Sequence, residues 1–182
     1  VVCDAETLDD LAFIAEATHA LADRLFWVGT GGLAVPLARM SRPEHGSCAV
    51  PLPQSGRGLL LVVGSVVKVS RDALRHVLAK QQVEHYSFTP QQLLGGVDAV
   101  LAGQGAAIAE ALAAGRDVAV EIAEVAHPDM ALGGRLAASL ARVLHKALES
   151  AAGLVVTGGE TAANLMAEVG IHGIRLVAEV ES

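Results

Sequence analysis

Two short aliphatic runs, each followed directly by a glycine-containing turn, constrain the fold of this chain more than any other feature. Leu59–Val63 precedes Gly64-Ser65, and residues 154–156 precede the loop 157–161, which reads Thr-Gly-Gly-Glu-Thr. A continuous aliphatic run is typical of a strand covered on both faces, and such strands occur in parallel sheets flanked by helices. Helical patterns lie between the runs. The sequence therefore predicts an α/β fold with a doubly wound, mostly parallel, Rossmann-like sheet and helices on both faces.

Composition agrees with this architecture and excludes some classes of binding partner. Hydrophobic residues make up 52% of the 182 residues but aromatic residues only 3%, so the core must be built from Ala, Val and Leu. The formal net charge of −7, with no cluster of Lys or Arg, argues against nucleic acid as a partner. No apolar run reaches the roughly 18 residues needed to cross a bilayer, so we expect a soluble, cytoplasmic protein with no membrane partner.

The cysteines and histidines predict no metal site. Cys3 and Cys48 lack ligand spacing, and we expect both to be free thiols in a reducing compartment. The seven histidines are scattered, and no pair of them lies in a recognisable ligand motif with Cys, Asp or Glu. The chain begins with neither an initiator Met nor a secretory signal, so we expect a fragment of a longer protein.

Periodicity and turn residues predict the other elements. A capping-box-like pair, Thr7 and Asp10, starts an amphipathic helix that continues to Leu25. The apolar run 26–28 reads as a strand before a glycine-rich turn and a helix over 33–40. Further helices are expected over 70–80, 106–114, 135–151 and 162–169, and further strands over 84–88, 118–122 and 174–180.

Proline and glycine divide the chain into three parts. Residues 41–58 carry Pro43, Pro51 and Pro53 and show no sustained period, which predicts a linker. We expect residues 1–40 to be the end of one domain and residues 59–182 to be most of another.

The loop 157–161 has the features of an anion site. It lies between an expected strand and an expected helix, where unpaired backbone N–H groups and the helix dipole favour a phosphate. Gly158 and Gly159 let the main chain approach a ligand without a Cβ clash. Glu160 is a candidate to hold a ribose hydroxyl or a water on Mg²⁺, and Thr161 adds a hydroxyl donor. A tight turn capped by threonine is the alternative.

Two other glycine-containing turns follow expected strands. Ser65, after the first aliphatic run, would face the loop 157–161 from the end of another buried strand. Residues 29–34 fit the loose pattern G-x-G-x-x-A, which makes a dinucleotide-dependent oxidoreductase an alternative, although the acidic residue expected about 20 positions on falls in the proline-rich linker. No G-x-x-x-x-G-K-[ST] segment occurs, which excludes a P-loop enzyme.

Taken in order, four segments resemble the landmarks of the four-carbon acid sugar kinase family, and the match spans nearly the whole chain. The segments are residues 2–11, 27–34, 62–65 and 156–162. The resemblance implies a two-domain phosphotransferase that uses ATP and Mg²⁺ to phosphorylate an alcohol group of a tetronate or 3-oxo-tetronate type acid sugar. Residues 1–40 would be the C-terminal remnant of a substrate-binding domain. Residues 59–182 would be the nucleotide-binding domain, truncated at its C-terminus.

The family's nucleotide contacts map onto two turns of this chain. Glu160 stands where the family usually has Asp, and Val67-Lys68 stands where it has a Ser-Pro pair. The family's D-D-x-T-G segment and its K-x-G-G-x-G-like segment are absent. The catalytic residue is therefore unknown, and we expect a chain truncated at both ends with little kinase activity by itself. The nucleotide contacts carried over are Ser65, Gly158, Gly159, Glu160 and Thr161.

A non-catalytic nucleotide-binding or sensing domain remains the alternative class to the kinase. The partners expected for the kinase are ATP and a small acid sugar. The sequence leaves a homo-oligomer open.

Overall fold

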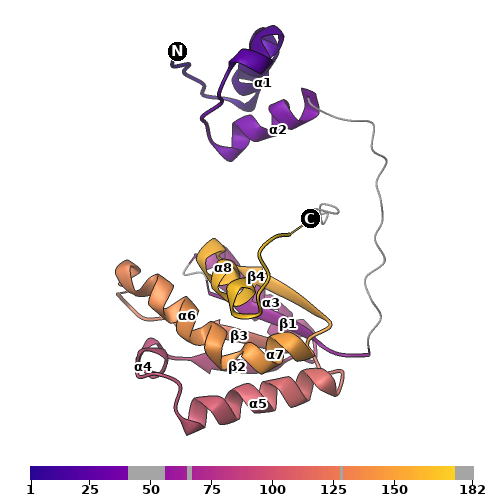
Figure 1. Cartoon of the computed structure of the whole chain (residues 1–182), viewed down its shortest axis with the longest axis vertical. Coiled ribbons are helices and arrows are strands. Elements are labelled where there is room, and N and C mark those ends of the chain that lie inside the picture. The colour runs from indigo at the N-terminus through magenta and orange to yellow at the C-terminus, as the bar shows by residue number, and fades with distance from the viewer. Residues whose placement is uncertain (41–55, 65–66, 128, 175–182) are drawn as a thin grey trace. The chain divides into compact units, whose positions relative to one another are not determined.

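The structure, a computed structural model, describes residues 1–40, 56–64, 67–127 and 129–174 (Figure 1). The described residues fall into two compact units, 1–40 and 56–174, and each is described by itself. Most of the expected linker, Ser65 and nearly all of the strand expected over 174–180 lie outside the described residues. The division of the chain into a substrate-domain remnant, a linker and a truncated nucleotide-binding domain stays a prediction.

The first unit is helical. Its capping box forms as expected, because the Thr7 hydroxyl accepts from the Asp10 N–H and the Asp10 carboxylate accepts from the Thr7 N–H at 2.9 Å. The helix expected to reach Leu25 instead ends at Thr18, whose hydroxyl donates back to the Ile14 carbonyl, an arrangement that bends helices. The unit contains α1 (Leu8–Thr18), the 3-10 helix η1 (His19–Arg24) and α2 (Gly31–Met40).

The strand expected over 26–28 is wrong. These residues form no strand, and Phe26 and Val28 are 94% and 84% exposed. A strand needs a neighbour to pair its backbone groups, and the described part of this unit contains no other strand. A dinucleotide-binding turn follows directly after a strand. The G-x-G-x-x-A segment at 29–34 does not, so it lacks this feature.

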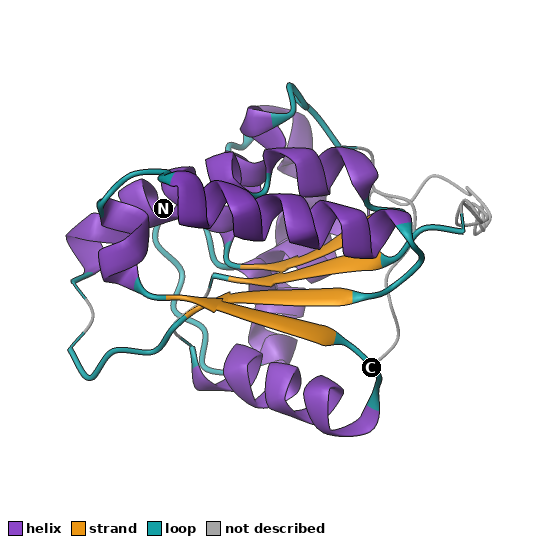
Figure 2. Cartoon of the chain, turned by 90° about the horizontal axis from the view of Figure 1, so that it is seen from below, coloured by secondary structure: helices purple, strands orange, loops and turns teal. Residues whose placement is uncertain are grey.

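The second unit is a four-stranded parallel sheet covered by helices on both faces, which confirms the predicted fold class (Figure 2). The strands lie in the order β2-β3-β1-β4, with Val62 of the first strand between Val120 and Val156. The strands are β1 (Leu59–Val63), β2 (Glu84–Phe88), β3 (Val118–Ile122) and β4 (Gly153–Thr157). The helices are α3 (Lys68–Lys80), α4 (Pro90–Leu94), α5 (Ala99–Ala113), η2 (Met130–Leu132), α6 (Gly133–Val143), α7 (His145–Ser150) and α8 (Gly159–Glu168).

Crossover handedness decides which helices cover which face. The chain first moves from β1 to β2, and the next two crossovers, from β2 to β3 and from β3 to β4, move in the opposite direction. Because crossovers between parallel strands are right-handed, this reversal places the later helices on the opposite face. Accordingly α3 packs on one face, while α4 to α8 pack on the other.

The side chains of β1 point alternately to the two faces of the sheet, so the strand contributes to a hydrophobic core on each face. Leu60 and Val62 are fully buried against the layer formed by α4 to α8, where Phe88 is the largest buried side chain. Val63 packs on the other face against Leu74 of α3. The aliphatic run was predicted to be buried on both faces, and this prediction is confirmed.

Several helix boundaries differ from the prediction. The helix expected over 106–114 starts at Ala99, because Asp98 caps it by accepting from the Leu101 N–H at 2.9 Å. The long helix expected over 135–151 is two helices, α6 and α7, which meet at Leu144. The last helix begins at Gly159, three residues earlier than expected.

Candidate functional site

The structure brings the two glycine-containing turns of the second unit together. β1 and β4 are neighbours, with Val63 opposite Thr157, and the Gly64 N–H donates to the Thr157 carbonyl at 3.3 Å. The two strands continue into helices on opposite faces, α3 after β1 and α8 after β4. Open α/β sheets bind ligands at the carboxyl ends of such strands. The expectation that the turn after β1 faces the loop 157–161 holds for Gly64.

Gly64 lies close against Thr161 of the other turn. A Cβ on Gly64 would lie 1.9 Å from the Thr161 Oγ1 and 2.7 Å from the Thr161 Cβ. Thr161 is itself buried, with 5% of its surface exposed, so it has little room to move away. A glycine at position 64 therefore allows the first turn of α8 to dock on the end of β1.

The start of α8 leaves backbone donors available. Gly158 occupies the N-cap position with φ of +97°, a conformation that favours glycine, and no side chain caps the helix within the described residues. Gly159 is exposed, and a Cβ there would meet nothing within 4 Å. The first N–H groups of a helix have no intrahelical partner, and together with the helix dipole they favour an anion.

One buried hydroxyl beside this helix start has no partner. The Thr157 Oγ1 is buried and makes no hydrogen bond within the described residues. A buried polar atom without a partner costs free energy unless a ligand or water satisfies it. The residues present therefore fit a phosphate group, which would accept from Thr157 and from the N–H groups of Gly159 and Glu160.

The Glu160 side chain lies beside the start of α6. Its two carboxylate oxygens lie 2.8 Å from the positions that Cβ atoms would take on Gly133 and Gly134, at the start of α6. An acidic side chain at a helix N-terminus is favourable for the helix dipole. The Glu160 carboxylate thus approaches α6 through two glycines, and its expected contact with a ribose hydroxyl or a magnesium-bound water stays a prediction.

The structure places four of the five predicted site residues together, and their contact with a nucleotide stays a prediction. Gly158, Gly159, Glu160 and Thr161 lie together at the start of α8, with Thr161 buried against Gly64. Ser65 lies outside the described residues, so its contact stays a prediction.

A partly buried ion pair beside the site was not predicted. Arg71 of α3 is 6% exposed, and it donates to the Glu121 carboxylate and to the Ile122 carbonyl, both at 3.2 Å. Glu121 lies opposite Val63 at the end of β1, and it also contacts His85 at 3.2 Å. The contact between Arg71 and Glu121 spans 50 residues, and no local sequence signal indicates it.

The described residues contain no group of three His, Cys, Asp or Glu side chains that could hold a metal ion. Cys3 is an exposed free thiol, and Cys48 lies outside the described residues. In the parts of the chain that the structure describes, every helix is too short or too polar to cross a membrane.

Comparison with known proteins places this arrangement in a family. Residues 60–182 match the family model described as the nucleotide-binding C-terminal domain. The chain is 37% identical over 185 residues to the D-threonate kinase of Cupriavidus necator, covering 100% of this chain and 44% of that protein. It is 33% identical over 186 residues to the D-threonate kinase of Bordetella bronchiseptica, covering 99% of this chain and 42% of that protein. The chain therefore spans somewhat less than half the length of these relatives.

A solved structure is similar over nearly the same length. It is a crystal structure of a domain of unknown function from Bordetella bronchiseptica, with bound citrate, crystallised as a domain-swapped dimer. It is 27% identical to this chain with a TM-score of 0.50, and the match covers 97% of this chain and 42% of that one.

Fold, loop and comparison define a nucleotide-binding α/β domain. The chain belongs to the nucleotide-binding C-terminal domain family, the C-terminal domain of the four-carbon acid sugar kinases. The resemblance carried by the sequence motifs is confirmed.

Proposed function

We propose that this chain is the ATP-binding part of an enzyme that phosphorylates a four-carbon acid sugar of the tetronate or 3-oxo-tetronate type. The family match and the similarity to two D-threonate kinases support this proposal. The observation that carries it is the start of α8, where uncapped N–H groups adjoin the buried, unpartnered Thr157 hydroxyl at the carboxyl ends of β1 and β4.

Each group at the helix start has a role in this proposal. The N–H groups of Gly159 and Glu160 bind phosphate oxygens, and the Thr157 and Thr161 hydroxyls donate to the same phosphates. Mg²⁺, which Glu160 would hold, would offset the negative charge of the phosphates during transfer. Magnesium keeps several waters and needs only one or two carboxylates, so Glu160 alone is a sufficient protein contact in this proposal.

The location and the assembly of the protein are further parts of the proposal. We infer a cytoplasmic enzyme, in keeping with the exposed free thiol of Cys3. A homo-oligomer is supported by the relative that crystallised as a domain-swapped dimer.

A catalytic assay on the full-length protein tests the function. The protein should convert ATP to ADP only when a four-carbon acid such as D-threonate is present, and the isolated 182-residue chain should show little turnover. Gly159→Val should lower kcat/KM for ATP at least tenfold, which corresponds to about 1.4 kcal/mol.

Gly103→Val is the matched control for this assay. Position 103 also lies on a helix, and a Cβ there also meets nothing within 4 Å, so activity should be unchanged. ATP binding without transfer to any tetronate would instead favour the non-catalytic sensing domain.

A further inference from the structure

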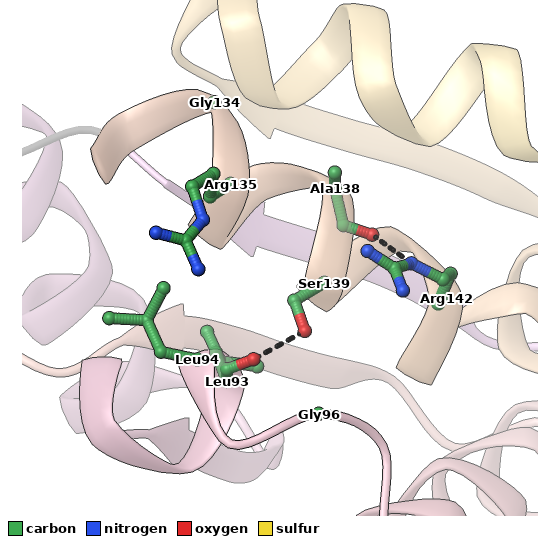
Figure 3. A pocket seen from close by; sticks show the side chains of 8 residues that line it. All are labelled: Leu93, Leu94, Gly96, Gly134, Arg135, Ala138, Ser139 and Arg142. Atoms are coloured by element: carbon green, nitrogen blue, oxygen red, sulfur yellow. Dashed lines mark hydrogen bonds between the residues drawn. The ribbon is translucent and has the colours of Figure 1, made fainter. Parts of the chain in front are cut away.

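A groove on the helical layer holds two arginines that have no acidic partner. It lies between α6 and the end of α4 with the segment that follows, and its cavity has a volume of about 310 Å³ (Figure 3). Ligand sites are commonly cavities of about 300–1,000 Å³ with mostly apolar walls and a few polar groups. None of the residues 157–161 lines the cavity. The lining residues are Leu93, Leu94, Gly96, Gly134, Arg135, Ala138, Ser139 and Arg142.

The two arginines lie on one face of α6. They are seven residues apart, which is two helical turns, so their side chains emerge on the same side. Figure 3 shows the Arg135 side chain extending from α6 toward Leu94. Arg142 donates through its Nε to the Ala138 carbonyl at 3.3 Å, which orients the guanidinium along the helix.

The described acidic groups nearby pair with neither arginine, although the Glu160 carboxylate lies beside Gly134 at the edge of the cavity. Within the described residues, neither Arg135 nor Arg142 forms an ion pair, and no acidic residue lines the cavity. Most other described cations of this unit do have acidic partners, namely Lys68, Arg71, Arg75 and Arg116. In a chain of formal net charge −7, unpaired arginines at one cavity form a local site for an anion.

A neighbouring cavity extends the positive charge. Its volume is about 600 Å³, and Arg142 lines both cavities. Lys146 and His145 of α7 add basic groups. The carboxylate that lines this cavity, Glu168, is already engaged with the His145 Nδ1 at 3.1 Å. Because the His145 imidazole also lies 3.8 Å from Glu149, Arg142 and Lys146 are the lining residues left to attract an anion at this second cavity.

The rest of the first cavity is mostly apolar. Ser139 is 4% exposed and donates to the Leu93 carbonyl at 2.6 Å, which ties α4 to α6 (Figure 3). Leu93, Leu94 and Ala138 present aliphatic surface. Such walls favour a ligand with an apolar body as well as a charged end.

We propose that this groove is a second ligand site, separate from the loop 157–161, which binds a small organic anion with an apolar body. Arg135 and Arg142 hold its phosphate or carboxylate group, since a guanidinium matches the geometry of either oxyanion. Leu93 and Leu94 contact the body. The net negative charge of the chain makes binding selective for this groove over the rest of the surface.

Titration of the isotope-labelled chain, followed by NMR, tests the proposal with three probes. Phenyl phosphate and benzoate carry the two oxyanions on the same apolar ring, and benzyl alcohol is the neutral control. At least one of the two anions should shift the amide signals of Gly96 and Ala138, while benzyl alcohol should not. A larger response to one anion identifies which oxyanion the groove prefers.

Charge-neutral variants separate the groove from general electrostatics. Arg135→Gln combined with Arg142→Gln should weaken binding of the preferred anion at least about tenfold, because both charge-assisted contacts are lost. Lys80→Gln removes one positive charge from α3, on the opposite face of the sheet, and should leave the affinity unchanged. Both arginines are exposed, so the double variant should fold, with circular dichroism as the check.

Three outcomes would overturn the proposal. The first is that neither anion shifts the groove amides. The second is that the anions shift only the amides of residues 158–161. The third is that the folded double variant binds as tightly as the unmodified chain.

Discussion

Gly64→Ala should destabilise the second unit and weaken nucleotide binding together. The added Cβ would lie 1.9 Å from the Thr161 Oγ1, 2.7 Å from its Cβ and 2.8 Å from its Cγ2. Rotation of the threonine side chain can turn only one of Oγ1 and Cγ2 away, because these two atoms fill two of the three staggered positions, and the Cβ stays fixed to the backbone of α8. The end of β1 and the start of α8 must therefore move apart.

The expected cost is that of overpacking a filled interior, about 1–3 kcal/mol. A change of 1 kcal/mol shifts the melting temperature of a domain of this size by about 4 °C. Because the same displacement moves Gly158 and Gly159 relative to β1, ATP affinity should also fall. Thermal unfolding followed by circular dichroism measures the first effect, and calorimetric titration with ATP measures the second.

A double-mutant cycle shows whether the contact with Thr161 is the cause. Thr161→Gly removes all three atoms that the new Cβ would meet, so the Gly64→Ala change should cost at least about 1 kcal/mol less in that background. Gly103→Ala is the control, because an added Cβ there meets nothing within 4 Å, and it should stabilise α5 by about 0.5–1 kcal/mol. If Gly64→Ala melts like the unmodified chain, or if the coupling to Thr161 is zero, the inferred close contact is wrong.

Three further predictions follow from named contacts. Arg71→Ala should cost about 2 kcal/mol in urea unfolding, because it removes a charged partner from the partly buried Glu121 carboxylate, and Arg71→Ala combined with Glu121→Ala should recover part of that loss. Burial, followed by the charge of Glu84, raises the pKa of Tyr86 above 10.0, so ultraviolet titration of this single tyrosine should show a midpoint above that value, and Glu84→Gln should bring it closer. Since the folded pKa is raised, the stability contributed by Tyr86 is fully present below pH 10 and is lost as the pH rises through the folded pKa. Thr89→Ala should lower stability by about 1 kcal/mol in the same unfolding assay, because Thr89 caps α4 by accepting from the Gln92 N–H. An unchanged stability would show that this cap does not stabilise the domain.

The strands that position the site could be predicted because their signals are local. β1, β2 and β3 have the bounds expected from the sequence, and β4 extends the expected run by one residue at each end. The run 26–28 has the same apolar character but forms no strand, because pairing partners rather than composition decide whether a short run is extended. The lack of an adjacent strand in residues 1–40 is not visible in the run itself.

The contacts within the site depend on the order of the strands. The amino-acid sequence alone does not predict that β4 lies beside β1. This adjacency brings Gly64 close to Thr161. The approach of Glu160 to the glycines that begin α6 likewise joins segments that are distant in sequence. The two glycines that begin α6 are only a weak local signal for this approach. Their role is evident in the folded structure, where Glu160 lies beside them.

Direct measurement of nucleotide binding tests the central claim, that the start of α8 holds the phosphates of ATP. Calorimetric titration should show that ATP and ADP bind the unmodified chain and the Gly103→Val control with equal affinity. Gly159→Val should bind both nucleotides at least about tenfold more weakly, because a branched side chain occupies the space of the phosphate oxygens. A Cβ at position 159 meets no other atom within 4 Å, so this variant should keep its melting temperature without ligand. Unchanged ATP affinity in a folded Gly159→Val variant would contradict the claim and exclude the loop 157–161 from the nucleotide site.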